Sequence, residues 1–354
     1  MLLFLLRRTA AIFVSFLFIT ALLYGITMLA PPEARARLYM SSRTRPDLPA
    51  AQEQNYLNSV IRQHGLNDPY PLQYGRWLLR LARGEWGWSP LFHDDVLRIL
   101  RRRSAATVEL TALALLLFVP MGLMAGMFAG WRQGRLSDGL VRFTAYISGA
   151  IPPFILGLVL ISVFYVGLHW FLLGRQGSEA AAIVRSEQYR SFTGFLTIDG
   201  LLNSRLDVTL DALRHLFLPA LTLAVAYWAL LTRLTRAGVV EETGKEYVVA
   251  AQARGLPSGR VVWRHVFPNA AAPALTSTAL TAASLVTGVY VIESVFDYPG
   301  VSDLIINSMG DVPDVTIALG FAVYSVIGVA LIMLLLDIVQ AFINPILRHG
   351  LGIS

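Results

Sequence analysis

The stretch AATVELTALALLLFVPMGLMAGMFAG, residues 105–130, decides the fold class, because its only charged side chain is that of Glu109. An apolar run of about 18 residues or more indicates a membrane-spanning helix, since about 20 helical residues cross the hydrocarbon layer. A helix also satisfies its backbone polar groups internally, as lipid requires. Of the 354 residues, 55% are hydrophobic and 15% are charged, against about 25% charged in soluble domains. We therefore expect an integral membrane protein.

Five further apolar blocks accompany this one and predict an all-α membrane protein with six transmembrane helices. They are Thr9–Ala30, Phe143 to about Leu173, Leu216–Thr232, Ala270–Ile292 and Val315–Ile343. The third block contains Pro152-Pro153 and is long enough to tilt or kink. The fourth block is short, so a buried or re-entrant segment is the alternative to a span there.

The first block is expected to remain as a membrane anchor. Arg7-Arg8 resembles the basic start of a signal peptide, and Ala34-Arg35-Ala36 resembles a cleavage site. However, the apolar block from Thr9 to Ala30 is longer than the roughly 7–15 residues of a signal-peptide core. Retention is therefore the preferred interpretation, and cleavage is the alternative.

Six spans place both termini on one side of the membrane. Short segments on that side carry Arg7, Arg8, Arg132, Arg135, the residues 233–264 and Arg348. Basic residues in short loops mark the cytoplasmic side. The opposing arginines lie in a segment of about 70 residues, a length at which loop charge no longer governs orientation. We therefore expect both termini in the cytoplasm.

The predicted spans divide the chain into two parts. Residues 1–104 form an anchor span plus an external segment, and residues 105–348 form a five-span core with a cytoplasmic loop at about 237–269. Aromatic side chains mark the external segment, and because Trp and Tyr favour the membrane interface, a helix lying on the outer surface is one interpretation. An interfacial anchor, or packing against neighbouring spans, is the preferred interpretation. The aromatic residues are Tyr70, Tyr74, Trp77, Trp86 and Trp88.

The loop sequence EYVVAAQARGLPSGRVVWRHVFPN, residues 246–269, predicts two short helices with a stop between them. Thr243 to Glu246 fits a capping box. Gly255 suits a left-handed helix end, Pro257 prevents direct continuation, and the second helix is expected to stop before Pro268. The predicted apolar face either packs on the spans or docks another subunit, and periodicity does not decide between them. This face consists of Val248, Ala251, Leu256 and Val262.

This loop resembles the EAA loop of ABC importer permeases, in which Glu-Ala-Ala is followed by a glycine and then by Ile-x-Leu-Pro. Ala250, Ala251, Gly255 and Pro268 match that pattern with the right spacing, whereas Val249, His265 and Phe267 depart from it. The closer resemblance is to the B-type permease of the oligopeptide/dipeptide/nickel importer family. It is carried by GRWLLRLARGEWGWS, ATVEL, DALRHLFLPALTL, LLTRLTR and VIESVFDYPGVSDLI. At the C-terminal end, Asn344-Pro345 stands where the family often has Asp-Pro-Arg.

The resemblance implies a type I importer permease in a bacterial inner (plasma) membrane. It implies four kinds of partner: a second homologous permease, two ABC ATPase subunits, an extracytoplasmic solute-binding protein and the lipid bilayer. Peptides are the expected cargo, and nickel or small glycans are the alternatives. The loop would contact an ATPase through a coupling helix. The residues that the resemblance assigns to this contact are Glu246, Tyr247, Ala250, Ala251, Arg254, Gly255, Leu256, Pro257, Arg264 and Pro268.

No catalytic motif accompanies these features, so we expect no enzyme activity in this chain. The only lysine, Lys245, is not in a GxxxxGK[ST] loop, so ATP and Mg are expected on the partner ATPases rather than here. HExxH and GxSxG are absent, the chain has no cysteine, and its six histidines show no i, i+4 pair. We therefore expect no metal site. Topology explains the net charge of +6 without nucleic acid.

Polar side chains within the spans are the remaining candidates. Glu109 is expected to form an interfacial salt bridge, with Arg103 a turn and a half away, or to be a protonated packing group rather than to face a water-filled path. Asp337 is expected to pair across the interface. The fifth span offers a possible substrate path, although close helix packing is preferred for its small residues. These residues are Thr276, Ser277, Thr281 and Ser284. A stand-alone secondary transporter and an intramembrane enzyme are the rival classes.

Overall fold

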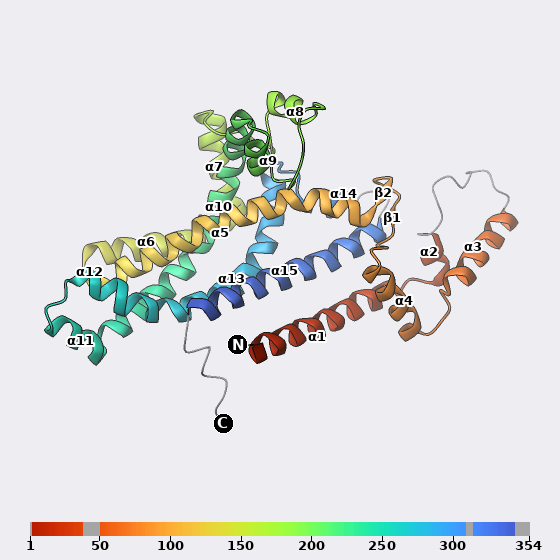
Figure 1. The fold of residues 1–354 in the computed structure, drawn as a ribbon. Coiled ribbons are helices and arrows are strands. Elements are labelled where there is room, and N and C mark those ends of the chain that lie inside the picture. Colours follow the sequence, from red (N-terminus) through yellow and green to blue (C-terminus); the bar gives the residue numbers. More distant parts are fainter. Residues whose placement is uncertain (1, 38–49, 309–313, 344–354) are drawn as a thin grey trace. The chain divides into compact units, whose positions relative to one another are not determined.

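The computed structural model describes residues 2–37, 50–308 and 314–343, and these are almost entirely helical (Figure 1). The two strands described, β1 (Trp88–Ser89) and β2 (Asp94–Asp95), form one antiparallel pair. The helices, of which η1 and η2 are π-helical, are α1 (Leu2–Thr27), α2 (Pro32–Arg37), α3 (Ala50–His64), α4 (Tyr70–Ala82), α5 (Val96–Trp131), α6 (Leu136–Ala150), α7 (Pro153–Leu160), η1 (Ile161–Gly167), α8 (Ser178–Val184), α9 (Leu196–Leu202), α10 (Leu206–Thr243), α11 (Glu246–Ala253), α12 (Ser258–Val261), η2 (Val262–Val266), α13 (Phe267–Val295), α14 (Ser302–Ser308) and α15 (Val315–Ile343).

The all-α membrane fold predicted from the sequence is confirmed. Among the described residues, four helical segments are long and apolar enough to cross a membrane: Thr9–Thr27, Val96–Trp131, Leu206–Thr243 and Val315–Leu334. A fifth crossing results if α6, α7 and η1 act as one broken span. The apolar part of α13 among the described residues, Ser284–Val295, is shorter than a span. Six crossings therefore remain a prediction.

The third apolar block is sharply bent where the sequence has two prolines. The segments Leu136–Ala150 and Pro153–Gly167 meet at an angle of 101°. A proline disfavours helical backbone in the residue before it, and Ile151 and Pro152 both have extended ψ angles, of 123° and 137°. The bend is therefore encoded locally by Pro152-Pro153.

The fourth block is part of a long helix, which favours the predicted span over the re-entrant alternative. α10 contains 38 residues and continues beyond the apolar block at both ends. His215 is 2% exposed, and its Nδ1 lies 2.8 Å from the Asp211 carbonyl oxygen. Near the other end, Arg236 forms a bidentate ion pair with Asp138 of α6, with N–O distances of 2.6 and 2.8 Å. Because these polar groups are satisfied within the protein, the helix extends past the apolar sequence.

Three glycines let α5 approach α10 closely. A Cβ added to Gly122, Gly126 or Gly130 would lie within 2.6–2.8 Å of α10 atoms. At Gly126 the nearest of these atoms is the backbone carbonyl oxygen of Thr232. Spacing of small residues by four places them on one helix face, a pattern that favours tight packing in membranes. This seam and the contact of α10 with α13 form the centre of a compact unit built mainly of residues 105–302, called here the core unit.

A second compact unit, called here the N-terminal unit, lies within Arg7–Ser104 and Asp303–Gly328. In it, α4 packs against the C-terminal part of α1 through aromatic rings. The rings of Tyr24 and Trp77 stack with centroids 5.0 Å apart, and the hydroxyl of Tyr70 donates to the carbonyl of Ala21 at 2.5 Å. Thus the interfacial aromatics anchor α4 on the anchor span, rather than leaving it isolated on a lipid surface.

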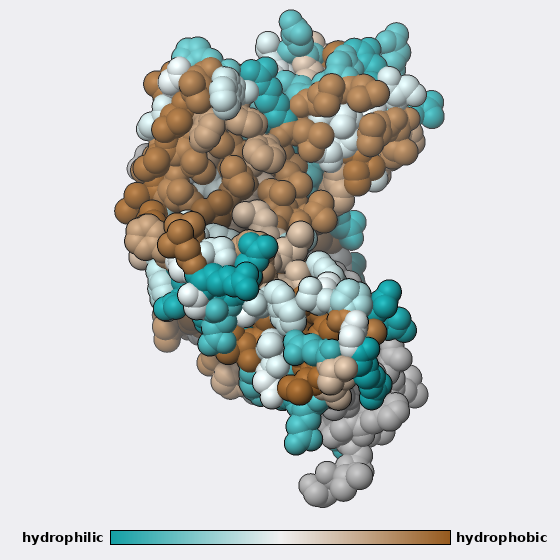
Figure 2. Space-filling model, turned by 90° about the vertical axis from the view of Figure 1, so that its left-hand side faces the viewer, coloured by the Kyte–Doolittle hydropathy of each residue, from teal (hydrophilic) through white to brown (hydrophobic). Residues whose placement is uncertain are grey.

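The surface carries the side chains expected of a membrane protein. Figure 2 shows a broad field of apolar side chains on the face it views. Helices α6 and α7 contribute large exposed apolar residues: Leu140, Phe143, Tyr146, Ile147, Phe154, Ile155, Leu158 and Val159. Exposed apolar area on this scale marks contact with lipid or with another protein.

Candidate functional site

The 246–269 segment is an ordered hairpin attached to two long helices. α10 ends at Thr243, two residues link it to α11, and α11 runs from Glu246 to Ala253. Gly255 has a φ of +76°, as expected of a left-handed helix end, and Pro257 precedes α12. The predicted break between two helical arms is therefore confirmed.

Two local predictions about this hairpin are wrong. The hydroxyl of Thr243 donates to the Val239 carbonyl at 2.6 Å, and α11 has no side-chain cap, so no capping box forms. The second arm does not stop before Pro268, because η2 joins α12 directly to α13. Pro268 occupies the first turn of α13, where the missing N–H has no helical partner to lose.

The apolar face of the hairpin packs within the core unit, which settles the alternative that the sequence left open. Val248 is fully buried, Ala251 and Val262 are 6% and 5% exposed, and Leu256 packs on the same cluster. Met127 of α5 and Val239 of α10 complete the cluster from the spans. Ala251 and Leu256, which were predicted as contact residues, therefore help to hold the hairpin on the spans, and their contact with a partner stays a prediction.

The opposite face of the hairpin is open. Val249 and Trp263 are 55% and 53% exposed. The other exposed residues predicted for this loop are Glu246, Tyr247, Ala250, Arg254, Gly255, Pro257, Arg264 and Pro268. Two large apolar side chains among arginines make a surface suited to another protein. Trp263 and Val249 were not among the predicted contact residues. Each directly follows a buried residue, Val262 and Val248, and this spacing could have indicated that both point away from the spans.

A polar knot fixes the base of the hairpin. Glu242, near the end of α10, accepts hydrogen bonds from Lys245 and from the hydroxyl of Tyr247. Asn269 donates to the Tyr247 hydroxyl at 3.2 Å and to the His265 carbonyl at 2.9 Å. Burial and the hydrogen bond to Glu242 raise the pKa of Tyr247, so its hydroxyl stays a donor. These hydrogen bonds connect the first turn of α11, through Tyr247, to the end of the hairpin at Asn269.

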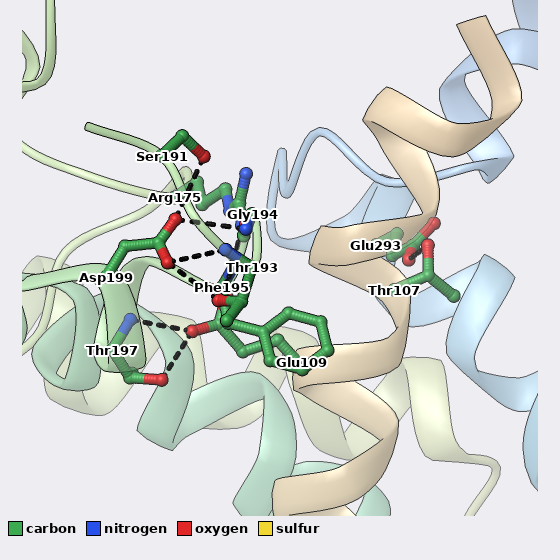
Figure 3. Close-up of polar contacts among 10 residues, drawn as sticks. All are labelled: Thr107, Glu109, Arg175, Ser191, Thr193, Gly194, Phe195, Thr197, Asp199 and Glu293. Atoms are coloured by element: carbon green, nitrogen blue, oxygen red, sulfur yellow. Dashed lines mark hydrogen bonds and ion pairs between the residues drawn. The ribbon is translucent and has the colours of Figure 1, made fainter. Parts of the chain in front are cut away.

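A second polar region lies near the opposite end of α5 (Figure 3). Glu109 accepts hydrogen bonds from the backbone N–H and hydroxyl of Thr197, at 2.9 and 2.6 Å. It also forms an ion pair with Arg175 at 3.1 Å, and Arg175 donates to the Gly194 carbonyl at 2.6 Å. The expected salt bridge of Glu109 is thus present, but Arg175 supplies the guanidinium and not Arg103. The sequence pointed to Arg103 because only local spacing was visible.

Asp199 organises the loop that Glu109 holds. Its carboxylate accepts from the N–H groups of Thr193 and Gly194 at 2.8 and 3.0 Å, and from two hydroxyls, those of Ser191 and Thr193. Burial raises the pKa of Asp199, but these hydrogen bonds to the ionised form outweigh burial and lower it overall. Residues 174–205, called here the α8–α9 segment, are therefore folded around a carboxylate that stays charged.

Glu293 of α13 is a second buried carboxylate that accepts several hydrogen bonds, and it lies on the other side of α5. It is 1% exposed and accepts from the Thr107 hydroxyl, as Figure 3 shows. It also accepts from the backbone N–H and hydroxyl of Ser302, at 3.0 and 2.6 Å. A Cβ at Gly300 would lie 2.0 Å from the carboxylate, so the turn after α13 packs directly against Glu293.

The predicted substrate path is only partly visible. Thr281 is 7% exposed, whereas Ser284 is exposed and its carbonyl accepts from the Tyr227 hydroxyl of α10 at 2.9 Å. The side chains of Thr276, Ser277 and Asp337 lie outside the described part of the chain, as does Asn344-Pro345. A path along this face of α13 therefore stays a prediction.

Comparison with known proteins places these features in context. The family model for the inner membrane component of binding-protein-dependent transport systems matches residues 122–349. The di/tripeptide transport system permease protein DppB of Pseudomonas aeruginosa is 30% identical, and the match covers 99% of both chains. The oligopeptide transport system permease protein AppB of Bacillus subtilis is 30% identical over 98% of this chain and 99% of its own length. The probable D,D-dipeptide transport system permease protein DdpB of Escherichia coli is 32% identical over 84% of this chain and 85% of its own length.

Proposed function

Because the chain belongs to the family of inner membrane components of binding-protein-dependent transport systems, the permeases of ABC importers, we propose that it carries peptides across the membrane. It forms half of the translocation path and pairs with a second, homologous permease. Two ABC ATPase subunits bind ATP and Mg and act on it from the cytoplasm, where both termini lie. A solute-binding protein delivers the cargo from outside.

The observation that carries this proposal is the two-sided hairpin. One face is anchored on α5 and α10 through Val248 and Val262, while Val249 and Trp263 face outward. A rigid element of this kind passes a movement of an attached subunit to the spans, which a flexible loop would absorb. The ATPase contact thus consists of the outward residues of the hairpin, with Arg254 and Arg264 at its polar edge.

Three relatives named as peptide permeases favour peptides as the cargo. Nickel and small glycans are the alternatives, and a stand-alone secondary transporter is the rival from another class. The chain with its partner subunits, reconstituted in vesicles, distinguishes these. The proposal expects a di- or tripeptide to accumulate only with internal ATP and external binding protein. Uptake by the purified chain without ATP would promote the secondary transporter.

The docking face has its own test. Val249→Asp places a charge on the outward face and is expected to release the ATPase during purification while leaving the permease folded. Val249→Ile keeps an apolar β-branched side chain at the same exposed position and is the matched control. Retention of the ATPase and full uptake by Val249→Asp would assign the contact elsewhere.

A further inference from the structure

The N-terminal unit contains a cavity to which the proposed function assigns no role. It has a volume of about 390 Å³ and lies between the C-terminal end of α1, α4 and the first turns of α15. Aromatic and aliphatic side chains form most of its wall, and three charged residues line it. The residues that matter here are Tyr24, Trp77, Leu319, Arg35, Arg80 and Glu85.

The cavity wall carries a buried positive charge with no acidic partner. Arg35 is 9% exposed and donates to the Ala30 carbonyl, the Leu66 carbonyl, the Gln73 side-chain oxygen and the Met28 sulfur, at 2.8–3.1 Å. All four acceptors are neutral, and no carboxylate among the described residues lies within ion-pair distance. These bonds hold the guanidinium in place without neutralising it, and a buried charge gains strongly from an opposite one.

A second guanidinium extends this positive charge. Arg80 of α4 lines the same cavity, is partly exposed, and makes no side-chain hydrogen bond or ion pair with the described residues. The only acidic side chain in the lining is Glu85, which is exposed at the rim and pairs with neither arginine. The cavity is therefore suited to an anion that enters from the rim.

The depth of the cavity identifies the kind of anion. Tyr24 and Thr27 end the span Thr9–Thr27, and Val315 and Leu319 begin the span Val315–Leu334. Both spans thus end at the level of the cavity, where lipid phosphate groups lie. Tyrosine and tryptophan side chains, which line it, favour that depth as well. A cavity lined by apolar side chains and two guanidiniums matches a molecule with an apolar body and an anionic head.

We propose that this cavity binds an anionic phospholipid, with the phosphate received by Arg35 and Arg80 and the upper acyl chain held against Trp77 and Leu319. A guanidinium binds phosphate through paired N–H donors, and Arg80 offers such a pair. Arg35 has one N–H group left beside its four hydrogen bonds, so it contributes mainly its positive charge. The lipid fills the space between α1, α4 and α15 and so joins these three helices within the N-terminal unit. This proposal is independent of the cargo and of the ATPase.

Native mass spectrometry of the full chain in detergent tests the proposal. Phosphatidylglycerol is titrated against phosphatidylcholine with the same acyl chains, and inorganic phosphate is a third ligand. The expected result is a preference of about tenfold for phosphatidylglycerol, which Arg80→Gln abolishes, as a charged hydrogen bond is lost. Because Arg80 has no partner among the described residues, its replacement leaves the fold intact. Arg35 is not replaced, since it ties together four groups.

The matched control is Arg83→Gln. Arg83 lies one turn along at the end of α4, is exposed and does not line the cavity. Equal binding of the two lipids, or an equal loss in Arg80→Gln and Arg83→Gln, would overturn the proposal in favour of general attraction to basic residues. Binding of inorganic phosphate at the affinity of phosphatidylglycerol would also overturn it, because the apolar wall would then contribute nothing.

Discussion

Thr107 and Glu109 lie two residues apart on α5 and reach in opposite directions (Figure 3). Two residues turn a helix by about 200°, so Thr107 meets Glu293 of α13 while Glu109 meets Thr197 of α9. One turn of α5 is therefore hydrogen-bonded on both sides, to the carboxylate of Glu293 on one and through its own carboxylate, Glu109, on the other. This arrangement fixes the α8–α9 segment and the turn after α13 to one place on α5.

The ion pair of Glu109 with Arg175 is expected to stabilise the α8–α9 segment. Arg175→Met leaves a carboxylate whose side chain is 5% exposed without its guanidinium. The loss of a hydrogen bond between charged groups typically lowers stability by about 1.5–3 kcal/mol. We expect faster hydrogen exchange over residues 190–203 and a lower unfolding temperature in detergent.

The control for this variant is Arg185→Met, in the same α8–α9 segment. Arg185 is exposed and makes no side-chain hydrogen bond or ion pair with the described residues. It is expected to leave both measurements unchanged. If the two variants exchange at the same rate, the ion pair contributes nothing to holding the segment.

The close contact of α5 with α10 predicts different effects for two helical glycines. A Cβ at Gly126 would lie 2.6 Å from the Thr232 carbonyl oxygen. A Cβ at Gly139 of α6 would have no atom within 4 Å. Gly126→Ala is therefore expected to destabilise by about 1–3 kcal/mol, through overpacking. Gly139→Ala is expected to stabilise slightly, since alanine favours a helix by about 1 kcal/mol. Unfolding temperatures in detergent give the comparison, and equal shifts would show that the helices separate easily.

Local sequence predicted the features that depend on local chemistry. The membrane class followed from apolar length, the bend of the third block from Pro152-Pro153, and the hairpin break from Gly255. Partners distant in sequence were not predictable, because spacing along one helix says nothing about them. Glu109 was therefore assigned to Arg103, although Arg175 lies 66 positions away. The length of α10 was missed for the same reason, since Asp138 of another helix satisfies Arg236.

Asp199 gives the α8–α9 segment a defined pH dependence. The folded state holds the ionised carboxylate through four hydrogen bonds, so its pKa is lower there than in the unfolded chain. The stabilisation is therefore complete above the ordinary pKa of an aspartate, and it is lost as the pH falls through the lowered value. The protection of residues 191–203 against hydrogen exchange, relative to an unfolded chain at the same pH, is expected to stay high at neutral pH and to fall only under strongly acidic conditions. Asp199→Asn should exchange faster at neutral pH and lose this dependence; an unchanged acid profile in the variant would assign the dependence to another group.

The φ of +76° at Gly255 predicts which substitutions the hairpin tolerates. A Cβ there would meet nothing within 4 Å, so only backbone conformation opposes a side chain. Left-handed backbone costs most residues about 1–2 kcal/mol, and a β-branched residue resists it most, whereas asparagine adopts it readily. Gly255→Val is expected to abolish ATP-dependent uptake while membrane insertion persists, and Gly255→Asn is expected to retain uptake. Because both variants add a side chain at the same exposed place, a difference between them isolates the turn. Uptake by Gly255→Val at the parental rate would mean that the break between the two arms does not need its observed geometry for coupling.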